Sequence, residues 1–245
     1  MYRFYVLPEQ IEEEEVFISG SDVNHIKNVL RLTVGEWVVV CDGDNTDYYC
    51  RINSLSSDEV VCHIEKKQPS GTELDAKIYL FQGLPKSDKM DWIIQKAVEL
   101  GVSCVVPVYT KRCVVKLDEK KAAKKQERWQ KIAESAAKQC DRGLIPRIEK
   151  PVTLAEAFDI AKGLEYNMMP YECAEGMEHA REVIAEAVKR TSIGIFIGPE
   201  GGLEEEEVSQ AVAAGCQVLS LGKRILRTET AGIAVISILM FHLQK

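Results

Sequence analysis

The sequence predicts an α/β protein with two parts, a small β-rich module and a mostly parallel sheet with helices. In the first 67 residues, apolar and polar side chains alternate between turn residues, a pattern typical of strands. From residue 78 onward, apolar strand-like runs alternate with helix-like stretches, a pattern typical of a parallel sheet. A third observation concerns function. A glycine-bearing loop, residues 198–202, follows a β-branched run, and open α/β sheets bind ligands at the carboxyl ends of such strands.

The first part, residues 1–70, is expected to hold several strands and one short helix. Ser21 or Asp22 is expected to cap the helix. The apolar face of this helix would consist of Val23, Ile26 and Leu30. The expected strands are 1–7, 37–41, 48–55 and 60–64. The polar stretch 66–75 is predicted to be a linker to the second part, residues 71–245.

The second part is expected to alternate strands and helices. The expected strands are 78–83, 102–109, a short one ending near Met169, 193–197 and 217–221. The expected helices are 88–100, 119–142, 154–162, 180–190, 204–214 and a final helix after Gly232. The final helix is apolar on nearly every face, which predicts burial on all sides and a subunit interface.

Composition argues against several classes of protein. None of the eight cysteines forms a Cys-x-x-Cys pair, and the four histidines do not cluster with them, so we expect free thiols and no metal site. The longest apolar stretch, 231–243, is too short to cross a bilayer, and the first residues do not resemble a signal peptide. We therefore expect a cytoplasmic protein without a membrane partner.

Charge is distributed unevenly. The chain carries a net charge of −7, yet residues 71–150 contain 17 basic and 11 acidic side chains. The basic residues of the 119–142 helix recur on one face: Lys120, Lys124, Arg128, Lys131, Lys138 and Arg142. A solvated helix face would explain this pattern as well, but the local excess of positive charge favours contact with RNA or DNA.

Two loops near the carboxyl end carry the chemistry. The glycine loop, residues 198–202, contains Glu200, which would repel phosphate, so its ligand is expected to be neutral or cationic. The cationic loop, residues 221–232, contains Lys223, Arg224 and Arg227. These side chains could pair with nearby glutamates, but three cations within five residues favour binding of a polyanion. If the strands before these loops are neighbours, both loops form one pocket. The glutamates at 204–207 suit the positive end of a helix, so structure alone could explain them.

The two loop sequences, GPEGG and LGKRILRTETA, resemble the signature of the SPOUT superfamily, and most closely its 16S ribosomal RNA (uracil-N3)-methyltransferase family. Three further blocks are similar to that family: HIKNVLRLTVGE, KSDKMDWIIQKAVELGV and RWQKIAESAAKQCDRGLIP. The resemblance covers nearly the whole chain. It implies a PUA-like β-barrel, then a SPOUT domain with a trefoil knot near the carboxyl terminus. It also implies S-adenosylmethionine as methyl donor, a homodimer formed through the knotted domain, and 16S rRNA or the small ribosomal subunit as substrate.

The resemblance also implies roles for individual residues. The expected cofactor-binding residues are Gly198, Pro199, Glu200, Gly201, Gly202, Leu221, Gly222, Ile225, Leu226, Arg227 and Thr228. Arg224 or Arg227 is expected to stabilise the uridine anion, with Glu229 as a candidate base. The expected RNA-binding residues are His25, Arg31, Lys86, Lys89, Gln139, Arg142 and Lys223. His25 is equally well interpreted as a structural histidine, and both Trp37 and Trp129 are expected in the core.

Two other functions remain open. Another methyl transfer on the same fold, such as 2′-O-ribose methylation, is the first alternative. A non-catalytic RNA-binding or ribosome-assembly factor is the second. A nucleotide hydrolase is disfavoured because the chain lacks a Gly-x-x-x-x-Gly-Lys-Ser/Thr motif.

Overall fold

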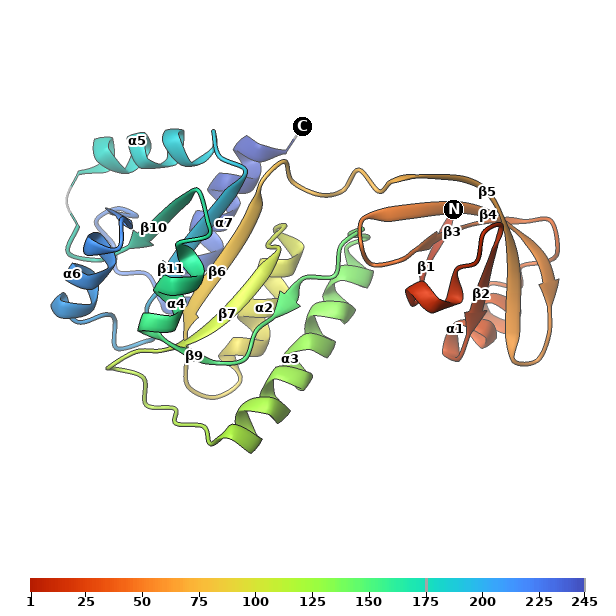
Figure 1. The fold of residues 1–245 in the computed structure, drawn as a ribbon, viewed down its shortest axis with the longest axis horizontal. Coiled ribbons are helices and arrows are strands. Elements are labelled where there is room, and N and C mark those ends of the chain that lie inside the picture. Colours follow the sequence, from red (N-terminus) through yellow and green to blue (C-terminus); the bar gives the residue numbers. More distant parts are fainter. Residues whose placement is uncertain (175, 245) are drawn as a thin grey trace. The chain divides into compact units, whose positions relative to one another are not determined.

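In the computed structural model, which describes residues 1–174 and 176–244, the chain divides into two units (Figure 1). Unit 1 comprises Met1–Glu73 together with Ala137–Ile145, and unit 2 comprises Leu74–Ala136 and Pro146–Lys245. The segment 137–145 includes the last turn of a long helix and the loop that follows it. Unit 1 is therefore not continuous in sequence.

Unit 1 is built on a five-stranded sheet with the order β1-β3-β4-β5-β2. Its strands are β1 (Tyr2–Tyr5), β2 (Glu15–Ser19), β3 (Trp37–Cys41), β4 (Thr46–Leu55) and β5 (Glu59–Pro69). β1 runs parallel to β3, and the other pairs are antiparallel. Alternate residues such as Val38, Val40 and Ile52 point into one apolar core, as the period-2 pattern predicts.

Unit 1 differs from the prediction in four places. β2 was missed because an acidic run precedes it, although Val16 and Ile18 alternate into the core. β5 continues through Pro69, into the stretch predicted to be a linker. The short helix α1 (Ser21–Asn24) is preceded by Gly20 at its N-cap, not by a Ser21 or Asp22 cap, and continues as a π-helical turn, His25–Val29. Trp37 is 38% exposed, so its expected core position was wrong.

Unit 2 contains a parallel sheet, as predicted, with the order β12-β10-β11-β6-β7-β8 and β9 also paired to β7. The strands are β6 (Lys77–Gly83), β7 (Cys104–Tyr109), β8 (Arg147–Ile148), β9 (Val152–Thr153), β10 (Tyr166–Pro170), β11 (Ser192–Ile197) and β12 (Gln217–Leu219). The helices are α2 (Lys89–Glu99), α3 (Glu119–Gln139), α4 (Leu154–Ala161), α5 (Met177–Ala187), α6 (Glu205–Ala213) and α7 (Thr228–Leu243).

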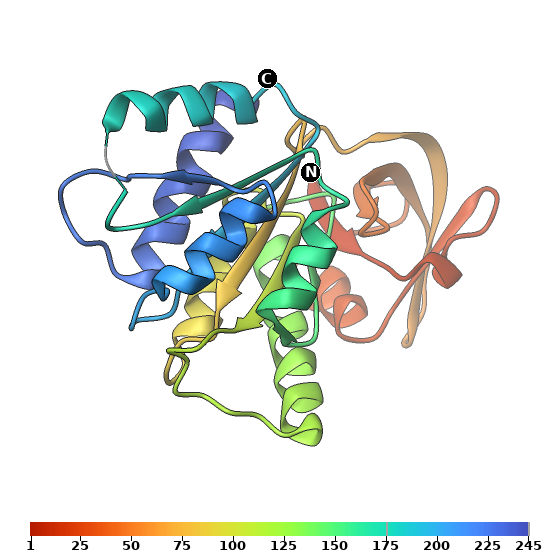
Figure 2. The same ribbon diagram turned by 60° about the vertical axis from the view of Figure 1, so that its left-hand side comes forward.

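Helices cover both faces of this sheet (Figure 2). On one face, α4 packs over β7 and β9, and α6 packs over β12. Phe158 of α4 also contacts Phe196 of β11, which stacks on Phe81 of β6 with the ring centroids 4.3 Å apart. On the other face, α7 packs against α2, β6 and β11. The apolar stripe predicted for α2 is confirmed, because Met90, Ile93, Ile94 and Ala97 are all buried.

The structure corrects two predictions about unit 2 and does not meet the condition set for the pocket. β11 and β12, the strands before the two loops, are not neighbours, because β10 lies between them. α7 begins at Thr228, inside the cationic loop and not after Gly232. It is also not buried on all sides, since Phe241 is 79% exposed and Ile238 is 41% exposed.

Candidate functional site

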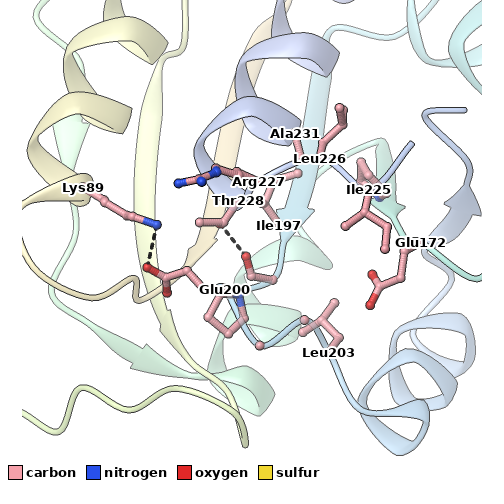
Figure 3. A pocket seen from close by; sticks show the side chains of 15 residues that line it. Lys89, Glu172, Ile197, Glu200, Leu203, Ile225, Leu226, Arg227, Thr228 and Ala231 are labelled. Carbon is pink, nitrogen blue, oxygen red and sulfur yellow. Dashed lines mark hydrogen bonds and ion pairs between the residues drawn. The ribbon is translucent and has the colours of Figure 1, made fainter. Parts of the chain in front are cut away.

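A pocket of about 390 Å³ opens where β10 and β11 end and α7 begins (Figure 3). All five residues of the glycine loop line it, together with part of the cationic loop, Ile225 to Thr228, and with Ala231. The two loops therefore meet, as predicted, although the strands before them are separated by β10. Apolar side chains of Ile197, Leu203, Ile225 and Leu226 form much of the wall.

The glycine loop lies close against the end of β6. A Cβ atom on Gly83 would come within 2.7 Å of Pro199 N, so only glycine permits this approach. At the other end of the loop, Gly202 has φ of +71° and its amide donates to Pro199 O at 2.9 Å. These constraints hold the loop in a tight turn with its backbone toward the pocket.

A hydrogen-bond chain fixes the start of α7 against the glycine loop. Buried Gln82 donates from Nε2 to Thr228 Oγ1 at 2.8 Å. Thr228 Oγ1 in turn donates to Gly198 O at 2.6 Å (Figure 3). Three segments that are far apart in sequence are thereby joined through one hydroxyl. Gln82 was not predicted as a site residue, because a single glutamine at the end of a strand has no recognisable pattern.

Lys89 connects two carboxylates at one side of the pocket. Its Nζ lies 3.0 Å from Glu200 Oε1 and 3.4 Å from Glu229 Oε2. Partial burial opposes ionisation of Glu200, but hydrogen bonds from its own backbone amide, Lys89 and the Lys86 N–H outweigh it and lower the pKa of Glu200. The hydrogen bond to Glu200 in turn raises the pKa of Lys89. Glu200 is therefore an ionised carboxylate that is already partly neutralised.

The cationic loop divides between the main pocket and a side recess. Leu221, Gly222 and Arg224 line the recess, whereas Arg227 lines the main pocket and extends toward the side on which Lys89 lies (Figure 3). Lys223, Arg224 and Arg227 are all exposed. Within the described part of the chain, none of these three forms an ion pair with a carboxylate. They are positioned to meet an external anion.

The other predicted RNA-binding residues are divided between the two units. His25, Arg31 and Gln139 are exposed on unit 1, and Lys86 is exposed on unit 2. Arg142 corrects the prediction: α3 ends at Gln139, and Arg142 lies beyond it, only 4% exposed, with Nη2 2.5 Å from Glu73 Oε2. A buried, paired guanidinium holds the 137–145 segment within unit 1 and does not present its charge to RNA.

Two pocket residues come from a region where the sequence showed no motif. Pro170, the last residue of β10, and Glu172, two residues beyond it, line the pocket. Glu172 lies across the pocket from Lys89 (Figure 3). The alternation of strands and helices could have indicated them, since β10 ends at the same edge as β11.

The loop after β7 packs against the glycine loop and α6. Arg112 donates from Nη1 to Gly201 O at 2.9 Å, and the Lys111 N–H donates to Glu207 Oε1 at 2.8 Å. The Lys111 ammonium also pairs with Glu204 and Glu206. The acidic start of α6 therefore binds this loop, in addition to any favourable interaction with the helix dipole.

The described residues lack two features that would indicate other kinds of site. No helix among residues 1–174 and 176–244 has the length and apolar character needed to span a membrane. Within the same residues, no cluster of histidine, cysteine, aspartate and glutamate side chains could hold a metal ion.

Comparison with known proteins adds independent information. Residues 72–240 match the RNA methyltransferase domain family, and residues 18–65 match the RNA methyltransferase PUA domain family. The chain is 38% identical to ribosomal RNA small subunit methyltransferase E of Bacillus subtilis, over 99% of this chain and 97% of that protein. The protein with this name from Mesomycoplasma hyopneumoniae is 32% identical, over 97% of this chain and 98% of its own length.

Solved structures agree with these matches. The crystal structure of a ribosomal RNA small subunit methyltransferase E from Neisseria gonorrhoeae, bound to S-adenosyl methionine, superposes with a TM-score of 0.80. The two sequences are 35% identical, and the alignment covers 98% of this chain and 97% of that one.

Proposed function

The chain belongs to the RNA methyltransferase family that includes ribosomal RNA small subunit methyltransferase E, and we propose that it methylates N3 of a uridine in 16S rRNA with S-adenosylmethionine as donor. The observation that carries this proposal is the pocket in which the glycine loop meets the cationic loop. The wall formed by the glycine loop, with Glu200, suits a nucleoside without phosphates. The cations of the cationic loop, which form no ion pair among the described residues, suit the phosphates of RNA.

The residues of the pocket fit S-adenosylmethionine. Its volume of about 390 Å³ is in the range of small-molecule sites. Apolar side chains and loop backbone would hold the adenosine, through Leu221, Gly222 and Ile225 to Thr228. The ionised Glu200 would disfavour a phosphate but not a sulfonium. When bound, the cofactor supplies a methyl group on a positively charged sulfur.

The acceptor requires help from the protein, because N3 of uracil carries a proton and methyl transfer needs the nitrogen lone pair. Glu229 Oε2 is buried, and among the described residues its one ion-pair partner is the Lys89 ammonium at 3.4 Å, which is beyond a well-formed hydrogen bond, so the carboxylate keeps capacity to accept that proton. Arg227 and Arg224 would stabilise the negative charge that develops on the base. Lys89 keeps Glu229 and Glu200 at fixed positions, so we assign it the organisation of the pocket in addition to its expected contact with RNA.

RNA would be held by cations and polar groups outside the pocket. On unit 2 these are Lys86 and Lys223, and on unit 1 His25, Arg31 and Gln139. We assign unit 1, with residues 1–70 as its main part, to a PUA-like RNA-binding domain, and residues 71–245 to the methyltransferase domain. The match of residues 18–65 to the RNA methyltransferase PUA domain supports this assignment.

We further propose a SPOUT domain with a trefoil knot, a homodimer and a cytoplasmic location. The strand order supports the knot, because the chain must return from the edge strand β12 past β10 and β11 before α7 packs against β6. An apolar groove between α5 and α7, lined by Ile184, Val188 and Ile238, supports the dimer. Phe241, three residues after Ile238 on the same helix, is exposed as well.

One experiment tests the activity. The protein is incubated with methyl-labelled S-adenosylmethionine and small ribosomal subunits from a strain that lacks the enzyme, with free 16S rRNA in parallel. Nucleosides are then identified by mass spectrometry. N3-methyluridine is expected. Ribose methylation would favour the 2′-O alternative, and binding of RNA without any transfer would favour an assembly factor.

Further experiments test the catalytic assignment. Arg224→Ala and Arg227→Ala are assayed separately for transfer at saturating cofactor. At least one variant should lose activity by about 100-fold or more, as when a group that stabilises a developing negative charge is removed. Full activity in both variants would refute the role of the arginines.

A further inference from the structure

Two opposite charges lie close to Gly202: Glu172, which lines the pocket at the end away from Lys89, and Arg112 of the loop after β7. A Cβ atom at Gly202 would be 2.8 Å from Glu172 Oε1 and 3.8 Å from Arg112 Nη1. Both groups therefore lie within a few ångströms of one point next to the glycine loop. Figure 3 shows the Glu172 carboxylate beside Ile225 and Leu203, across the pocket from Lys89.

Both charged groups retain free bonding capacity. Arg112 donates one hydrogen bond, from Nη1 to Gly201 O, and its Nε lies 3.9 Å from Glu204 Oε1, so several of its five N–H donors are unused. In the described chain Glu172 forms no ion pair, even with Arg112. An isolated carboxylate and a partly used guanidinium this close together suit a ligand that carries both charges.

The position of Arg112 is set by its neighbours. The Lys111 N–H is bound to Glu207, and a Cβ atom on Gly201 would lie 3.1 Å from Arg112 Cβ. The backbones of the two loops are thus in close contact, and Arg112 can reach the glycine loop without a large movement. The position of Glu172 is set by β10, because Glu172 lies only two residues after the end of that strand.

We propose that Arg112 and Glu172 form a clamp for the α-amino acid group of the cofactor, with the guanidinium binding its carboxylate and the carboxylate binding its ammonium. This inference rests on the proposed function, because it assumes S-adenosylmethionine in the pocket. A planar guanidinium binds a carboxylate through paired hydrogen bonds, and a carboxylate accepts hydrogen bonds from an ammonium. The clamp selects ligands with a complete amino acid end.

The test compares ligands that differ only in this end. Binding of S-adenosylhomocysteine and of 5′-methylthioadenosine, which lacks the amino acid, is measured by calorimetry for the wild type and for the variants Arg112→Ala and Glu172→Gln. Each variant should bind S-adenosylhomocysteine about tenfold or more weakly, the usual effect of losing a charged hydrogen bond. Binding of 5′-methylthioadenosine should not change.

A third ligand and two matched variants sharpen the test. Decarboxylated S-adenosylmethionine keeps the ammonium but lacks the carboxylate, so Glu172→Gln should weaken its binding and Arg112→Ala should not. Lys111→Ala removes a neighbouring cation that pairs with Glu206, and it should leave all three affinities unchanged. Arg112→Lys should recover part of the affinity for S-adenosylhomocysteine.

The outcomes separate the clamp from the activity. Equal weakening of all three ligands in Arg112→Ala would show that Arg112 only shapes the glycine loop, and would overturn the clamp. Unchanged binding of S-adenosylhomocysteine in either variant would also overturn it. If the wild-type protein binds none of the adenosine ligands, the proposed function itself is refuted together with the clamp.

Discussion

At the scale of single residues, the pocket depends on groups that each satisfy several partners. Thr228 accepts a hydrogen bond from Gln82 and donates one to Gly198 O, and Lys89 joins Glu200 to Glu229. When such a residue is replaced, both of its partners lose their interaction at once. The replacement leaves buried polar groups without partners, which costs more than the bond itself contributes.

Thr228→Val should disconnect the glycine loop from α7. The variant leaves Gln82 Nε2 and Gly198 O each without the partner that Thr228 supplied, so the free energy of unfolding should fall by roughly 1–3 kcal/mol. Urea denaturation measures this loss, and calorimetry with S-adenosylhomocysteine measures the accompanying loss of affinity. Thr228→Ser keeps the hydroxyl and should resemble the wild type. Equal behaviour of Val and Ser at this position would contradict the role of the hydroxyl.

Lys89→Ala should change how stability depends on pH. Lys89 lowers the pKa of Glu200, so its stabilising effect is complete above the ordinary carboxyl pKa of about 4.3 and disappears as pH falls through the lower folded value. The difference in unfolding free energy between wild type and variant should therefore shrink in acid. Denaturation curves between about pH 3 and pH 7 measure it.

Lys96→Ala is the matched control for that experiment. Lys96 lies on the same helix and pairs with Glu99 at 2.7 Å, with an exposed fraction close to that of Lys89. It should not alter the titration of Glu200, as followed by NMR. A Glu200 titration that is identical in wild type and Lys89→Ala would count against the ion pair.

At the scale of elements, the site is produced by chain segments that pack at glycines. The end of β6 lies against the glycine loop because Gly83 has no side chain, and α7 lies close to β6 and β11 at Gly232, where a Cβ atom would be 3.8 Å from Gln82 Oε1 and Ile197 Cγ1. The first contact has no spare room, whereas the second has ordinary van der Waals spacing. The two positions should therefore respond differently to substitution.

Gly83→Ala should displace the glycine loop. The added methyl group would meet the backbone of Pro199, which cannot rotate away. The free energy of unfolding should therefore fall by about 1–3 kcal/mol, and cofactor binding should be weaker. Thermal unfolding and calorimetry measure the two effects. Gly163→Ala is the control, because its nearest neighbour would be 3.4 Å away. A Gly83→Ala protein with normal stability would disprove this close approach.

At the scale of the whole molecule, the exposed apolar surface of unit 2 is what a second subunit would cover. The groove between α5 and α7 is mainly apolar. Phe241 of α7 directly precedes His242, which lines the groove, and is 79% exposed. Exposed aromatic side chains beside an apolar groove are typical of protein interfaces. The apolar character of α7, predicted to reflect an interface, is thus present on its exposed side.

Phe241→Asp should convert the proposed dimer into a monomer. A charge within an apolar interface is costly to bury, so the dissociation constant of the dimer should rise by at least an order of magnitude. Sedimentation velocity measures the mass in solution. Val114→Asp, at an exposed residue in the loop after β7, is the control and should leave the mass unchanged. A wild-type protein that sediments as a monomer would refute the dimer.

The sequence by itself determined the elements and the chemistry of the two loops. Strand and helix periodicity, glycine turns and the charges of Glu200, Arg224 and Arg227 are local properties, so they can be recognised without knowing the fold. Only the tertiary structure decided which strands are neighbours, that β10 separates β11 from β12, and that Glu172, Gln82 and Arg112 join the site. It also showed that Arg142 is buried and paired with Glu73. These facts depend on contacts between residues far apart in the chain, whose free energies are set by packing and not by local propensity.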